Sequence, residues 1–168
     1  MNVNASIIGI GPIQARLRAV GSLLQNPQPM LNEIGETVVE STKLRFTDGA
    51  GPTGAPWAPL RQVTLARRRK QGKGAQPLLD TGRLRNSFAK RIEPRAVWIG
   101  TNVPYAAVHQ FGAAKGSLGT GRYKTRKGSF PIPWGNIPAR PFLGFSQDDQ
   151  AEIMEIITRR IQQAGGTA

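Results

Sequence analysis

A segment rich in proline and glycine, residues 49–60, separates two parts of this chain that carry different sequence patterns. Its sequence, GAGPTGAPWAPL, holds three prolines and three glycines, so a regular helix or strand is excluded there. Trp57 lies within this segment and is expected to pack on the folded body and hold the loop in place.

The residues before this loop predict two helices. Apolar side chains recur on one helical face in residues 13–24, and a second, longer helix is expected over residues 29–46. Residues 4–10 are short and apolar, so we interpret them as an edge strand that Gly11-Pro12 interrupts. The apolar face of the first helix consists of Ile13, Leu17, Val20 and Leu24.

The residues after the loop predict a β-hairpin flanked by short helices. Residues 88–93 and 96–101 alternate along each strand and are joined by a turn at Pro94-Arg95. Trp98 on the second strand is interpreted as a core side chain, and so is Phe111. The short helices are expected at residues 65–71, from Asp80 or Thr81 to about Ser87, and at residues 105–111.

Residues 112–132 show the least regular pattern in the chain. They contain five glycines and five basic residues, and a stretch of this length without a clear element is typical of a functional or disordered loop. We therefore predict a flexible basic loop at residues 112–132. One further strand is expected at residues 141–145.

The last helix has the clearest signals in the sequence. Ser146 and Asp149 form a capping box, since a serine precedes an acidic residue by three positions at the start of an apolar repeat. Ile153, Ile156 and Ile161 lie on one helical face. Together the patterns predict a single α+β domain over residues 1–168, with a small, mostly antiparallel sheet and long helices near both ends.

The positive charge of the chain is confined to its middle. The formal net charge is +13, and residues 61–127 carry sixteen basic residues against two acidic ones, whereas the flanking parts are close to neutral. This stretch fits contact with nucleic-acid phosphates or with an acidic protein surface, and a solvated basic face is a third interpretation.

Residues suited to catalysis are scarce. The chain has no cysteine, and His109 is its single histidine, so neither a zinc site nor a Ser-His-Asp arrangement is favoured. His109 is interpreted as a structural or interface residue. The carboxylates of the last helix, such as Asp148 and Glu152, are explained by capping and solvation. We expect no catalytic site, metal or cofactor, no signal peptide and no membrane segment.

Several short motifs lie in a fixed order along most of the chain. Each motif alone has little specificity, whereas the ordered set is fairly specific. In chain order they are Trp57-Ala58-Pro59-Leu60, Thr64, Leu79-Asp80-Thr81-Gly82-Arg83-Leu84 with Ser87, Ile99-Gly100-Thr101, Tyr105-Ala106, His109-Gln110-Phe111-Gly112 and Ile137-Pro138-Ala139-Arg140-Pro141-Phe142-Leu143-Gly144. Over residues 35–160 this ordered set resembles the phage virion-morphogenesis family, which includes the tail-completion proteins of Mu-like phages. The basic loop at residues 115–127 departs from that family's pattern.

The resemblance implies a structural virion protein without catalytic activity. It implies a ring, commonly of six copies, at the head–tail junction or the head-proximal end of the tail. The expected partners are other copies of the chain, the tail tube protein and a neck or connector protein, with packaged DNA passing through the channel. We expect the protein in the virion, and in the host cytoplasm during assembly. The alternative is a nucleic-acid-binding module that uses the basic middle segment.

Two groups of residues are the candidates for contacts with these partners. Arg140 is expected to present its guanidinium to a carboxylate, within the chain or across a subunit boundary, because Pro138 and Pro141 stiffen the chain on either side. The candidates for contact with DNA or an acidic partner are Arg67, Arg68, Arg69, Lys70, Lys115, Arg122, Lys124, Arg126 and Lys127. The candidates for a subunit interface are His109, Phe111, Arg140 and Phe142.

Overall fold

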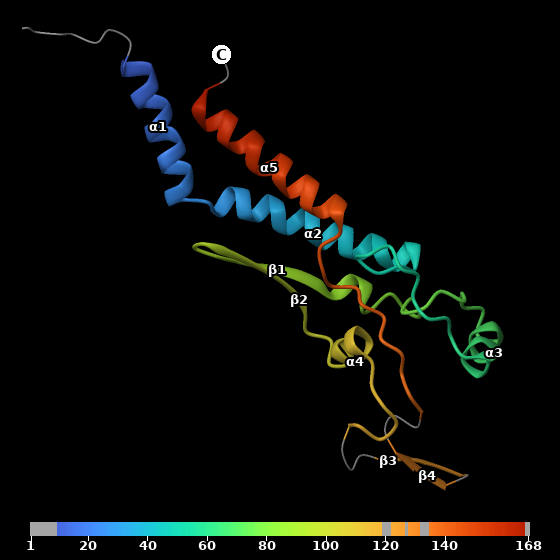
Figure 1. Ribbon diagram of the computed structural model, residues 1–168. Helices are drawn as coiled ribbons and strands as arrows, with labels where there is room; N and C mark the ends of the chain where they lie inside the picture. Colours follow the sequence, from blue (N-terminus) through green and yellow to red (C-terminus); the bar gives the residue numbers. More distant parts are fainter. Residues whose placement is uncertain (1–9, 119–121, 127, 132–134, 167–168) are drawn as a thin grey trace, which may run out of the picture.

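The computed structural model describes residues 10–118, 122–126, 128–131 and 135–166, and it has the predicted α+β class (Figure 1). The long helix α2 lies between helix α5 on one side and the hairpin β1–β2 on the other. The elements in chain order are α1 (Ile10–Gln25), α2 (Gln28–Asp48), α3 (Gln62–Lys70), the 3₁₀ helix η1 (Arg85–Ser87), β1 (Phe88–Glu93), β2 (Ala96–Thr101), α4 (Ala106–Phe111), β3 (Arg122–Thr125), β4 (Gly128–Pro131) and α5 (Gln147–Gly165).

Helix α2 supplies side chains to both parts of the core. Ile34 and Val38 are buried against Ile156 of α5, with residues of the hairpin at the edge of this cluster. Farther along α2, Val39 and Phe46 enter a second cluster that the loops complete. Gly49 ends the helix with φ of 70°, in the left-handed region that glycine adopts without strain, and its N–H donates to the carbonyl of Arg45.

The hairpin β1–β2 has the predicted bounds and pairs Phe88 with Thr101 and Ile92 with Val97. The face that includes Val97 packs on α2, and the approach is close at Gly35: a Cβ there would lie 2.8 Å from Cγ2 of Val97. Glycine at this point therefore allows the helix to lie directly on the sheet. The opposite face carries Trp98, whose side chain is 59% exposed.

Four aromatic rings form the centre of the second cluster. Phe46 and Phe142 are fully buried, and the ring of Phe46 lies 5.3–5.8 Å from those of Trp57, Phe88 and Phe142. Trp57 is buried and its Nε1 donates to the carbonyl oxygen of Pro141 at 2.7 Å. The prediction that Trp57 fixes the Pro/Gly-rich loop on the body is therefore confirmed.

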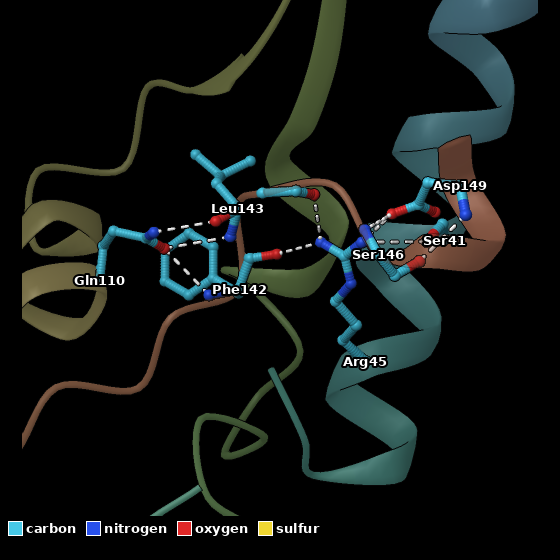
Figure 2. A network of polar contacts seen from close by, with 8 residues as sticks. Ser41, Arg45, Gln110, Phe142, Leu143, Ser146 and Asp149 are labelled. Atoms are coloured by element: carbon cyan, nitrogen blue, oxygen red, sulfur yellow. Dashed lines mark hydrogen bonds and ion pairs between the residues drawn. The ribbon is translucent and has the colours of Figure 1, made fainter. Parts of the chain in front are cut away.

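Helix α5 is joined to α2 by a buried ion pair (Figure 2). The predicted capping box is present, since Asp149 N–H donates to Ser146 Oγ at 3.0 Å and Ser146 N–H donates to Asp149 Oδ2 at 2.6 Å. The same carboxylate binds the guanidinium of Arg45, which also donates to the carbonyls of Phe142 at 2.7 Å and Gly144 at 2.9 Å. One arginine thus connects α2, the strand-like segment before α5, and the start of α5.

Several local predictions differ from the structure. Helix α1 begins at Ile10 and includes Gly11, so these residues do not interrupt a strand, while residues 4–9 lie outside the described part. Residues 141–145 form no strand and run as an extended connection held by side-chain hydrogen bonds. Only the 3₁₀ helix η1 forms where a short helix was expected after Thr81. Among the described helices, none is both long and apolar enough to cross a bilayer.

The stretch predicted to be a loop at residues 112–132 contains the strands β3 and β4. They pair antiparallel, with Arg122 opposite Pro131 and Thr125 opposite Gly128. The strand pair β3–β4 is called the arm below. A bridge between Ala113 and Ile137 joins the two chain segments that lead to it. Figure 1 shows the arm extending away from α2 at the end of the molecule opposite to α1.

Candidate functional site

Residues from most of the motifs that carry the family resemblance line one cavity of about 520 Å³. The cavity lies between α3, the segment before η1, the helix α4 and the segment that precedes Pro141. Six of the seven sequence motifs, far apart along the chain, contribute to its wall, and only Ile99-Gly100-Thr101 does not. The lining residues are Leu60, Arg61, Thr64, Arg68, Leu78, Asp80, Thr81, Gly82, Arg83, Leu84, Tyr105, His109, Gly135, Asn136, Ile137, Pro138 and Arg140.

Arg140 joins two of these motifs through the backbone. Its Nε donates to the carbonyl of Ala58 at 2.7 Å and its Nη2 donates to that of Pro59 at 3.0 Å. The side chain is 6% exposed. Its guanidinium therefore holds the Pro/Gly-rich loop. The described residues of this single chain supply no carboxylate partner, so the expected pairing of Arg140 with a carboxylate stays a prediction.

Helix α4 positions the connection to α5 through Gln110 (Figure 2). Gln110 Oε1 accepts the backbone N–H of Phe142 at 2.9 Å and of Leu143 at 3.0 Å, and its Nε2 donates to the carbonyl of Leu143 at 3.0 Å. Gly112 follows with φ of 76°, and a Cβ there would lie 2.9 Å from the backbone of Ala139. The motif that contains Gln110 and Gly112 is thus explained by close packing of two backbone segments.

Charged groups of both signs line the cavity, with cations in excess. Arg68 is 6% exposed, and its Nη1 donates to the carbonyl of Gln76 at 2.6 Å. Asp80 lies 4.0 Å from Nε of Arg68 and 2.8 Å from Nζ of Lys73. The hydrogen bond from Lys73 is the main cause that lowers the pKa of Asp80, and the charge of Arg68 adds to it.

His109 is half-buried beside these cations. Its ring packs edge-on against Tyr105, with 5.7 Å between the ring centroids, and the Nδ1 atom is buried without a hydrogen-bond partner in the described structure. Burial lowers the pKa of His109, and the charge of Arg140 lowers it further. Both effects favour the neutral imidazole in the isolated chain. No group of three or more His, Asp or Glu side chains in the described residues is arranged to hold a metal ion.

The candidates for contact with DNA or an acidic partner fall into two places. On α3, Arg67, Arg69 and Lys70 are exposed, whereas Arg68 turns inward to the carbonyls described above and so belongs to the folded body. The others lie at or near the arm: Lys115, Arg122, Lys124 and Arg126 are exposed, and Lys127 lies outside the described residues.

The four candidates for a subunit interface differ in how exposed they are. Phe111 is 78% exposed and lies at the end of α4, so the interpretation of this ring as a core side chain is wrong. Phe142 is fully buried in the aromatic cluster, so its ring is not available to a neighbouring subunit. Arg140 is buried as well, and His109 lines the cavity.

Sequence reasoning missed the exposure of the apolar face of α1. Ile13, Leu17 and Leu24 are 59%, 68% and 61% exposed, because α1 packs mainly against α5 at one end of the molecule. Trp98, also interpreted as a core residue, stands uncovered on the hairpin. The helical periodicity marked the α1 face correctly as apolar, but periodicity does not show whether the covering surface lies within the same chain.

Comparisons with known proteins agree with the motif pattern. A model of the phage virion morphogenesis family matches residues 9–162. The chain is 31% identical to the Mu-like prophage FluMu G protein 2 of Haemophilus influenzae over 145 residues, which is 86% of each protein. It is 28% identical to the tail completion protein S of Escherichia phage P2, over 78% of this chain and 81% of that protein. No solved structure matches significantly. The chain therefore belongs to the phage virion morphogenesis family, a family of structural proteins of the virion.

Proposed function

We propose that this protein is a non-catalytic tail completion or terminator subunit that forms a ring of six copies at the head–tail junction. The relative in phage P2 is named a tail completion protein, and it aligns with this chain over 81% of its own length. The observation that carries the proposal is the large apolar surface that the single chain leaves uncovered. A stable monomer seldom exposes a row of large apolar side chains along one helix face, such as Ile13, Leu17 and Leu24 of α1.

The uncovered apolar side chains lie in separate places, which fits a ring. Ile13, Leu17 and Leu24 belong to α1 at one end of the molecule, while Phe111 lies on α4 toward the other end (Figure 1). A subunit of a ring contacts two neighbours through two different surfaces, so it needs two patches that are not related by a two-fold axis. A monomeric nucleic-acid-binding module needs neither.

Changing the apolar face of α1 tests this proposal. We expect the double variant Leu17→Glu with Leu24→Glu to raise the concentration at which the ring dissociates by about 100-fold, since each buried interface anchor contributes about 1–2 kcal/mol. Native mass spectrometry and light scattering measure the change. The control is Gln14→Glu with Gln25→Glu, which adds the same charge to exposed polar positions of the same helix. A wild-type chain that stays monomeric at every concentration would contradict the ring itself.

The exposed basic residues are the proposed contacts with the partners of the ring. In this role the exposed cations of α3 and the arm face either packaged DNA or an acidic surface of the tail tube or neck protein, and assembly takes place in the host cytoplasm. The arm favours the nucleic-acid alternative in one respect: Arg122 and Lys124 of β3, and Arg126 directly after it, stand at every second position and are all exposed.

The salt dependence of DNA binding distinguishes an arm that contacts DNA from an arm that contacts an acidic protein surface. If the arm binds DNA phosphates, the apparent affinity for a duplex falls steeply with salt, and the triple change Arg122→Gln, Lys124→Gln and Arg126→Gln reduces the slope of log K against log salt by about 3. Filter binding between 50 and 200 mM salt measures this slope. Tight, salt-sensitive DNA binding by a monomer would favour the nucleic-acid module and reject the ring. Weak binding that the triple change leaves unaffected would assign the arm to a protein partner.

A further inference from the structure

The cavity described above holds a buried guanidinium, that of Arg140, for which the described part of the chain supplies no carboxylate. Arg140 and Arg68 are each 6% exposed and both line the cavity, together with the exposed Arg83. Asp80 is the one acidic residue of the lining, and it pairs with Lys73 at 2.8 Å and lies 4.0 Å from Arg68. Arg140 donates only to backbone carbonyls in the hydrogen bonds described. A buried guanidinium of this kind is completed by an anion.

The cations of the cavity also act on one another. Burial lowers the pKa of Arg140, and the charge of Arg68 lowers it further, so the two guanidinium groups repel. His109 is affected in the same way by burial and by Arg140. An anion placed among the three side chains relieves this repulsion and lets the imidazole accept a proton.

Two further features are typical of a binding site rather than of a surface hollow. Nδ1 of His109 is buried without a hydrogen-bond partner in the described structure, although polar atoms at such depth are almost always paired. Leu78, which lines the cavity, has φ of 60° and is the one non-glycine residue of the described chain with a positive φ. Backbone strain of this kind gathers at functional sites.

We propose that this cavity binds a carboxylate carried by an apolar protein segment of a neighbouring protein in the assembled particle. The cations supply the partners for the carboxylate, and the walls formed by Leu60, Leu78, Leu84 and Ile137 favour apolar side chains beside it. A backbone phosphate of DNA carries no such apolar group. The proposal rests on the proposed function only for the source of the segment, which is either a second copy of this chain or another virion protein.

Because His109 is the only histidine, its imidazole proton resonance reports on the cavity without ambiguity. We expect N-acetylleucine, a carboxylate with an apolar side chain, to shift this resonance saturably at millimolar concentration and to raise the pKa of His109. The uncharged N-acetylleucinamide and inorganic phosphate serve as comparison ligands. The titration is carried out where the chain is monomeric, either by dilution or with the α1 double variant.

The outcome of this titration decides the proposal. An equal response to the amide would show an apolar cavity without anion preference, a response to phosphate alone would show a phosphate site, and no response to any ligand would show no site; each overturns it. Arg83→Gln, at an exposed position of the lining, is expected to weaken N-acetylleucine binding about threefold, and Arg95→Gln in the hairpin turn should leave it unchanged. Equal effects of the two variants would also overturn it.

The assembled protein distinguishes the two sources of the segment. If a second copy supplies the carboxylate, the His109 resonance of the assembly without added ligand matches that of the ligand-bound monomer, and if another virion protein supplies it, the resonance stays at its free position. Native mass spectrometry of the same samples reports ring formation independently. A ring with an unresponsive cavity would reject this inference alone, whereas a responsive monomer that never assembles would reject the proposed function alone.

Discussion

Replacing Asp149 with asparagine is expected to lower the free energy of unfolding by about 3–5 kcal/mol, because it leaves the buried Arg45 guanidinium without its carboxylate. Asp149 is 2% exposed and Arg45 is 6% exposed, so water does not compensate for the lost charge. The change also weakens the capping box, since the carboxylate accepts the backbone N–H of Ser146. Denaturation in urea, followed by circular dichroism, measures the loss.

The matched control is Asp148→Asn, one residue earlier in the same helical turn. Asp148 is exposed, so the control removes the same charge near the helix N-terminus and should cost no more than about 1 kcal/mol. If the two variants lose similar amounts of stability, the ion pair between α2 and α5 contributes little beyond the helix dipole. That result would contradict the assigned role of Arg45.

The pH dependence provides a second readout of the same carboxylate. Burial by itself raises the pKa of Asp149, but hydrogen bonds from Ser41 and Ser146 and the charge of Arg45 lower it below its usual value. A carboxylate with a lowered pKa stabilises the folded state above its unfolded pKa of about 3.9, and this contribution is lost as the pH falls further. The difference in stability between the wild type and Asp149→Asn should therefore be constant near pH 7 and shrink below about pH 4.

Features determined by neighbouring residues could be predicted from the sequence. The capping box of Ser146 and Asp149 and the register of the hairpin around Pro94 depend on residues a few positions apart, so local patterns were sufficient. The position of Trp57 could also be predicted, because a large aromatic residue in a loop without regular structure has few alternatives to burial.

Features determined by contacts between distant segments could not be predicted in this way. Arg68 and Arg140 donate to backbone carbonyls 6 to 82 positions away, and nothing in the local sequence separates such arginines from exposed ones. Trp98 and Phe111 have patterns typical of core residues, yet the described chain has no element that covers them. The strands β3 and β4 were missed because glycine and basic residues obscure the alternation of side chains.

The cavity is also a feature that depends on contacts between distant segments of the chain. From its isolation in the sequence His109 was predicted to have a structural or interface role, and Asp80 or Thr81 was expected to begin a short helix. The fold places His109, Asp80 and Arg140 in the lining of one cavity, which neither prediction anticipated. Each motif residue was visible in the sequence, but their common location follows only from how the connecting segments pack.

Replacing Phe142 with alanine is expected to lower the free energy of unfolding by about 3–5 kcal/mol, because it removes a fully buried ring from the aromatic cluster. The ring of Phe142 lies 5.6 Å from that of Phe46 and 5.4 Å from that of Phe88, so its loss leaves a cavity between two rigid neighbours. The backbone hydrogen bond from Phe142 N–H to Gln110 does not depend on the side chain and should persist. Urea denaturation at two protein concentrations measures the effect.

The control for this variant is Phe145→Ala, three residues farther along the same segment. Phe145 is 58% exposed, so its truncation should change the stability of the single chain by less than about 1 kcal/mol. A core role for Phe142 predicts a loss that is independent of protein concentration, since the contacts lie within one chain. If the loss instead grew with protein concentration, as expected when a variant cannot form an interface that stabilises the wild type, Phe142 would be a subunit contact and its burial in the single chain would not describe the assembled protein.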